Sequence, residues 1–71
     1  METNILARVP GRYLAAALNS LPQPAAVTAD TMDAVVDVPG FGPVRLTARR
    51  RTSRKGKAVM VFWTAEHAVV T

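Results

Sequence analysis

Apolar residues near the N-terminus recur with the spacing of one helix face. Four of them share the positions i, i+3, i+4 and i+7: Leu14, Ala17, Leu18 and Leu21. A 3.6-residue period places such positions on one side of a helix. Pro10 suits the first helical turn, where its missing N–H has no partner, and Pro22 ends the pattern. For residues 4–9 an extra helical turn, a short strand and a loose arm stay open, and we favour a helical extension.

After Pro24 the period of the apolar residues changes to two, which is typical of strands. In residues 32–38 and 44–49, apolar side chains alternate with polar or charged ones. The inward set is Ala34, Val36, Val38, Val44, Leu46 and Ala48. Between the two runs lies Pro-Gly-Phe-Gly-Pro, residues 39–43, which predicts a five-residue turn.

Charge predicts the register of this hairpin. Pairing Val38 with Val44 gives apolar pairs on one face and opposite charges on the other. The charged pairs are Asp37 with Arg45 and Asp33 with Arg49. A slip by one residue would place Asp37 opposite Val44 and turn the apolar set to solvent, and this penalty is expected to specify the register.

A third strand is predicted over residues 57–64, which are apolar on both faces and rich in β-branched and aromatic side chains. A loop over residues 52–56 would join it antiparallel to the second strand. Depending on its register, either Phe62 or Trp63 shares the face of the arginines. Residues 65–70 either continue the strand or close with a turn.

These elements predict an α+β fold of two layers, with one N-terminal helix packed on a three-stranded antiparallel β-meander. Residues 1–71 form a single small domain, in which residues 1–8 are a candidate flexible arm. A core of this size rarely supplies more than roughly 3–5 kcal/mol of stability.

Positive charge is concentrated in one half of the chain. Residues 1–44 carry two arginines against four acidic side chains, whereas residues 45–71 carry seven cations against Glu66. Six cations fall within residues 49–57, here called the basic tip: Arg49, Arg50, Arg51, Arg54, Lys55 and Lys57. Such a local positive field attracts polyanions.

The basic tip has two interpretations. Arginine offers forked donors to phosphate, so the tip is a candidate site for DNA or RNA. The alternative is a solvated loop that keeps the protein soluble and guards a sheet edge. Pairing of Arg49 with aspartate would leave five cations, more than solubility requires, and we favour nucleic-acid binding. Trp63 is a candidate for base stacking and Phe41 for partner contact, although both residue types more often pack in a core.

The sequence does not favour an enzyme, a cofactor or a metal site. His67 is the only histidine, there is no cysteine, and no serine lies in a recognisable nucleophile motif. On one strand, Asp33 and Asp37 would lie roughly 13 Å apart, too far to share an ion. The absence of cysteine and of a leader-like N-terminus leads us to expect a soluble cytoplasmic protein without a membrane span.

The rival hypothesis is a small protein-interaction module or inhibitor, such as one that blocks a nucleic-acid enzyme. Its basic tip would meet an acidic protein surface, and Phe41 or an exposed aromatic would anchor the contact. A meander also leaves two open edges, so a homodimer through an open sheet edge belongs to the same class.

Overall fold

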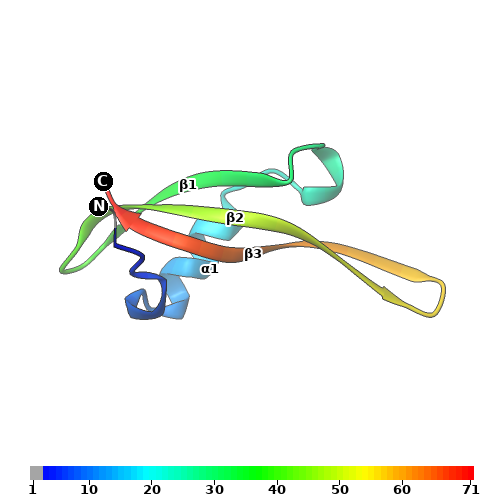
Figure 1. Cartoon of the computed structure of the whole chain (residues 1–71), viewed down its shortest axis with the longest axis horizontal. Helices are drawn as coiled ribbons and strands as arrows, with labels where there is room; N and C mark the ends of the chain where they lie inside the picture. The colour runs from blue at the N-terminus through cyan, green and yellow to red at the C-terminus, as the bar shows by residue number, and fades with distance from the viewer. Residues whose placement is uncertain (1–2) are drawn as a thin grey trace.

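The computed structural model describes residues 3–71 and shows the predicted α+β fold (Figure 1). Three strands form an antiparallel sheet of order β1-β2-β3, and the helix α1 covers one face of it. The elements, in chain order, are η1 (Leu6–Arg8), α1 (Gly11–Asn19), η2 (Pro24–Ala26), β1 (Thr31–Val38), β2 (Gly42–Lys55) and β3 (Ala58–Val70). The predicted two-layer α+β meander is therefore confirmed.

The helical region differs from the prediction at both ends. Pro10 is the residue before α1 and not part of its first turn, and α1 ends at Asn19, before Leu21. Residues 6–8 form a 3-10 turn and do not extend α1. The Ile5 N–H donates to the carbonyl of Ala68 at 2.8 Å, so the segment before α1 is bound to β3. In the described part of the chain, no helix is long and apolar enough to cross a membrane.

Two adjoining clusters between the helices and the sheet make up the core. The first is formed by five buried residues from the N-terminal segment and all three strands: Ile5, Val9, Val38, Val44 and Ala68. The second joins α1 to the middle of the sheet through Ala17, Ala34, Leu46 and Ala48. The apolar side chains of the alternating pattern in β1 and β2 therefore point inward, as the sequence predicts. No polar or charged residue is buried among residues 3–71.

The predicted register of the β1–β2 hairpin is wrong by two residues. Val38 pairs with Gly42 and not with Val44, so the loop has three residues and not five. Pro39 and Gly40 form a tight turn in which the Phe41 N–H donates to the Val38 carbonyl at 2.9 Å. Gly40 has φ 87°, the value that the third position of a type II turn requires.

A shift of two residues keeps every side chain on its predicted face, because strands have a period of two. It does change the cross-strand partners. Asp33 faces Thr47 and accepts a 2.8 Å hydrogen bond from its hydroxyl, while Asp37 faces Pro43. The predicted pairings of Asp33 with Arg49 and of Asp37 with Arg45 are therefore wrong.

The second hairpin is much longer than predicted. Residues 52–55 belong to β2 and are not a loop, and residues 65–70 continue β3. The pairing of β1 with β2 ends at Arg49, so β2 and β3 run on as two strands only. We call residues 51–62 the hairpin arm. It extends well beyond α1 and β1 (Figure 1) and gives the molecule its 44 × 21 × 20 Å shape.

Candidate nucleic-acid interface

A two-residue turn closes the hairpin arm. Lys55 pairs with Ala58, and Gly56 and Lys57 connect them. Gly56 has φ 61°, whereas no residue other than glycine has a positive φ in the described chain. A glycine with positive φ at the first central position is typical of a type II′ turn, whose twist suits a β-hairpin. Most of the basic tip is therefore strand, with a fixed register and alternating faces.

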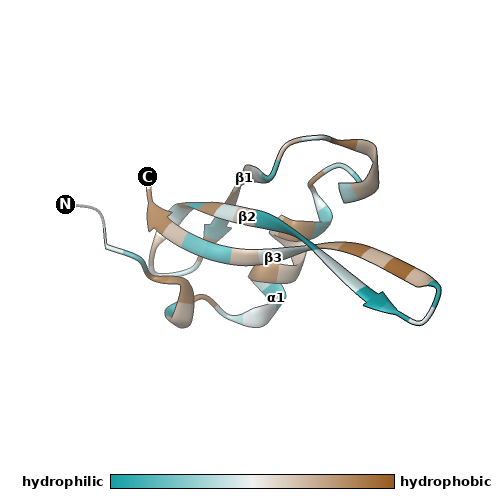
Figure 2. Ribbon diagram, turned by 45° about the vertical axis from the view of Figure 1, so that its right-hand side comes forward, coloured by the Kyte–Doolittle hydropathy of each residue, from teal (hydrophilic) through white to brown (hydrophobic). Residues whose placement is uncertain are grey.

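The two strands of the hairpin arm differ in chemistry. The β2 strand of the arm is polar and cationic, while the β3 strand carries Ala-Val-Met-Val-Phe from Ala58. Figure 2 shows this contrast as one hydrophilic strand beside one hydrophobic strand. Polarity in the arm thus divides by strand and not by face, which is unusual for a sheet with one solvated face.

Cross-strand pairing settles which aromatic lies with the arginines. Arg50 pairs with Trp63 and Arg51 with Phe62. Trp63 packs against the second core cluster, so it shares the helix-side face with Arg50. By alternation Phe62 lies on the other face of β3 from Trp63, directly beside Arg51, and it also borders the groove between β3 and α1. With 38% of its surface exposed, Phe62 is the aromatic that is available next to a cation.

The charge of Arg49 is neutralised by an ion pair with another residue of the chain, Glu66. Its Nε lies 2.9 Å from Oε1 of Glu66, and both side chains are about two-fifths exposed. This hydrogen bond, together with the charge of the carboxylate, raises the pKa of Arg49. Glu66 reaches this position because a β-bulge leaves it without a partner between His67, opposite Thr47, and Ala65, opposite Ala48.

Arg50 is also held by the domain, which corrects its predicted status as an unpaired cation. Its Nη1 donates to the carbonyl of Val27 at 2.6 Å, and its Nη2 lies 3.7 Å from the carboxylate of Asp30. The backbone N–H of Arg50 donates to the Asp30 carbonyl at 2.8 Å. Arg50 therefore fastens the chain before β1 to the base of the arm.

The four remaining cations of the basic tip are exposed and make no ion pair within residues 3–71. They are Arg51, Arg54, Lys55 and Lys57. Because strand residues alternate, Arg51 and Lys55 lie on the outer face and Arg54 on the helix-side face. With Lys57 in the turn, positive charge surrounds the end of the arm on both faces.

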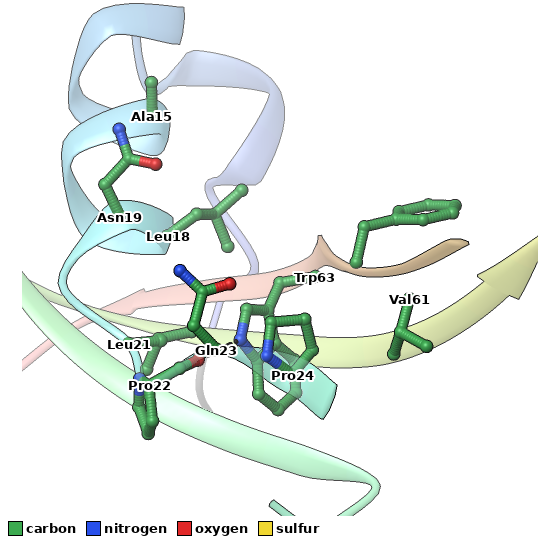
Figure 3. A pocket seen from close by; sticks show the side chains of 10 residues that line it. Ala15, Leu18, Asn19, Leu21, Pro22, Gln23, Pro24, Val61 and Trp63 are labelled. Atoms are coloured by element: carbon green, nitrogen blue, oxygen red, sulfur yellow. Dashed lines mark hydrogen bonds between the residues drawn. The ribbon is translucent and has the colours of Figure 1, made fainter. Parts of the chain in front are cut away.

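Trp63 forms part of a groove at the base of the arm. Its indole N–H donates to the Pro22 carbonyl at 2.9 Å, so its polar atom is satisfied by the domain. The groove has a volume of about 410 Å³. Figure 3 shows Leu18 of α1 on one side and Val61 and Trp63 of β3 on the other, with the Pro22–Pro24 connector between them. Trp63 thus serves packing, and the groove lies beside the β3 strand of the arm.

Phe41 lies at the opposite end of the sheet from the basic tip. It is partly buried and packs against the first core cluster, and the Arg8 guanidinium lies 5.2 Å from its ring centroid. Phe41 therefore covers the end of the core. The β1–β2 turn, which holds Phe41, and the turn of the hairpin arm lie at opposite ends of the long axis (Figure 1), so the structure does not bring Phe41 together with the four exposed cations.

Three exposed apolar residues of the arm, Val59, Met60 and Phe62, were not singled out as a surface by sequence reasoning. Their signal was the apolar character of the third strand on both faces, which fits a doubly covered strand as well as an uncovered edge. Among residues 3–71 no group of three or more His, Cys, Asp or Glu side chains is placed to hold a metal ion. Comparison with protein-family models, curated proteins and solved structures finds no significant match for this chain.

Proposed function

We propose that this protein binds nucleic acid, DNA or RNA, through the hairpin arm. The observation that supports the proposal is the set of four exposed cations, which make no ion pair with any of residues 3–71, around the end of an arm that extends beyond the core. The proposal includes no catalytic step and no cofactor, and it assigns the protein to the cytoplasm, where a chain without cysteine needs no disulfide.

The shape of the arm suits this target. A two-stranded antiparallel ribbon fits the major groove of B-DNA, which is about 12 Å wide. The arm is such a ribbon, because β2 and β3 continue there without β1. Arg51 would donate to a phosphate while Phe62, its cross-strand neighbour, contacts a base or sugar.

The first test measures affinity against salt. With four phosphate contacts, the slope of log K against log salt should be about −3.6 for duplex DNA and about −2.8 for a single strand. Replacing both Arg51 and Arg54 by Ala should flatten the slope by about 1.4–1.8, since two contacts are lost. Fluorescence anisotropy with labelled single-stranded and duplex oligonucleotides at several salt concentrations gives both values.

The chain offers a control of equal charge. Arg8 and Arg12 lie over the rings of Phe41 and Tyr13, away from the arm. The double change of Arg8 and Arg12 to Ala removes the same net charge and should leave the slope unchanged. If both double variants weaken binding equally, net charge and not the arm governs affinity, and the proposal fails. It fails as well if the wild-type protein does not bind at low salt.

A further inference from the structure

Among residues 3–71, strand edges are open in three places: along β1, along β3 before Ala68 binds Ile5 and Asn4, and at the end of β2. β1 and β3 are the outer strands of the sheet. The pairing of β1 ends at Arg49, and the Arg50 N–H makes a last bond to Asp30, so β2 is also open from Arg51 to Lys55. An open edge presents unpaired N–H and C=O groups to which another strand can pair, and natural proteins usually guard such edges with charge.

Two of the three edges carry that protection. On β1, Asp33 and Asp37 lie two residues on either side of Val35, so antiparallel pairing of two copies about Val35 would place these aspartates opposite each other. The open part of β2 holds Arg51, Arg54 and Lys55, and self-pairing there would bring cations together. Like charges directly opposite destabilise a strand pair.

The β3 edge carries no such protection. From Ala58 to Ala65 it holds eight residues without a charge. Val59 is 52% exposed and Met60 64%, on opposite faces of the strand. Exposed apolar residues along an unguarded edge strand mark a site of strand pairing. Antiparallel pairing of two β3 strands opposes no charges anywhere within these eight residues.

We infer that the protein forms a symmetric homodimer in which the β3 strands of two copies pair antiparallel along the hairpin arms. A twofold axis perpendicular to such a pair passes between two copies of the same residue, and Val61 and Phe62 lie nearest the middle of the uncharged segment. The two arms then form a four-stranded ribbon with the apolar β3 strands at its centre.

Electrostatics favours this arrangement. The cationic β2 strands occupy the two outer edges of the ribbon, three strand spacings apart, which is roughly 14 Å. That separation exceeds the screening length of about 8 Å at physiological ionic strength, so the two sets of cations hardly repel each other.

The groove at the base of the arm fits the same partner. It lies on the helix-side face beside Val61 and Trp63, and its lining combines apolar side chains with the polar Asn19 and Gln23 (Figure 3). A second β3 strand added at this edge carries Val59 and Val61 on its own helix-side face. These valines would enter the groove from the open side, which removes apolar surface of both copies from water.

The four-stranded ribbon of the dimer, roughly 14 Å between its outer strands, is wider than the major groove of about 12 Å. A dimer would therefore contact nucleic acid at its cationic outer edges and not by insertion of one arm. The dimer itself is tested without nucleic acid. Sedimentation equilibrium of the wild-type protein over micromolar concentrations should give twice the chain mass of 7.6 kDa. Changing both Met60 and Phe62 to Glu places carboxylates opposite each other across the symmetry axis and should give the mass of one chain. Circular dichroism checks that the variant keeps its fold.

A control of equal charge uses the other edge. Changing Thr31 and Val35 to Glu adds two carboxylates to the outer face of β1, opposite Arg49 and Arg45. This variant should remain dimeric. A wild-type protein with the mass of one chain would overturn the inference, as would a dimer that the Thr31 and Val35 variant abolishes and the Met60 and Phe62 variant leaves intact.

Cysteine cross-linking tests the pairing directly, because the chain has no cysteine of its own. Residues that face their own copy across the symmetry axis lie within the 4.4–6.8 Å Cα separation of a disulfide. Val61→Cys or Phe62→Cys should therefore cross-link rapidly under mild oxidation, and Val35→Cys, at 64% exposure, should not. Cross-linking of Val35→Cys at the same rate would contradict the assignment of β3.

Discussion

At the scale of single residues, Glu66 determines how much of the basic tip is available. The bulge in β3 brings its carboxylate to Arg49 at 2.9 Å, and the hydrogen bond keeps that guanidinium occupied. Asp30 and the Val27 carbonyl occupy Arg50 in the same way. The positive field of the tip therefore comes from the four exposed cations of the arm. Arg49 and Arg50, at its base, are bound to other parts of the domain.

Removing the charge of Glu66 should release Arg49. We expect Glu66→Gln to steepen the slope of log K against log salt by about 0.7–0.9, the contribution of one additional phosphate contact. Asp33→Asn is the control, because Asp33 accepts a hydrogen bond from Thr47 and lies on the body of the sheet. The role given to Glu66 would be disproved if both variants changed the slope by the same amount.

At the scale of elements, the hairpin arm depends on its turn. The arm has no helix against its distal part, and an isolated two-stranded hairpin is marginally stable in water. Gly56, with φ 61°, allows the two-residue turn that sets the register of Lys55 with Ala58. The arm is therefore the part of the molecule that opens at the lowest free energy.

Gly56→Ala should loosen the arm without unfolding the body. An added Cβ meets no atom within 4 Å, so its effect comes from the backbone alone. A left-handed conformation costs roughly 1–2 kcal/mol for a residue other than glycine. Amide exchange in residues 51–62 should then accelerate about 5- to 30-fold, as measured by NMR.

Gly11→Ala provides the matched control, since Gly11 begins α1 and its φ is not positive. It should leave exchange in the arm unchanged. Equal exchange rates in the Gly56 variant and the wild type would show that the turn does not limit the arm.

At the scale of the whole molecule, a small core supports a long sheet. The largest fully buried side chains are Leu46, Val38 and Val44, which lie on β1 and β2. Such a core supplies roughly 3–5 kcal/mol, and the arm adds surface without adding to it. Pairing of two arms would bury apolar surface that the single chain leaves exposed.

Leu46→Ala should therefore unfold most of the protein. Truncation of a fully buried leucine costs about 2–5 kcal/mol, which is comparable to the whole stability expected of this core. Thermal unfolding followed by circular dichroism measures the loss. Val35→Ala, at a site 64% exposed, should change the free energy of unfolding by less than about 0.5 kcal/mol. A cooperative transition of Leu46→Ala at the wild-type temperature would contradict the assigned core.

The sequence by itself determined the elements and their faces. Local periodicity carries that information: the helical spacing of Leu14, Ala17 and Leu18 predicted α1, and alternation predicted which residues of β1 and β2 point inward. The predicted faces of β1 and β2 are correct although the predicted register of their hairpin was wrong by two residues, because strand faces repeat every two residues.

Only the tertiary structure decided which residues meet. The tight Pro39-Gly40 turn set the register and separated Asp33 from Arg49, and the bulge at Glu66 supplied the partner of Arg49 instead. Pairing of β2 with β3 as far as Lys55 and Ala58 made residues 52–55 strand where a loop was expected, and its register placed Phe62 beside Arg51. Turn geometry, bulges and strand ends depend on contacts between segments distant in sequence, and periodicity within one segment does not encode them.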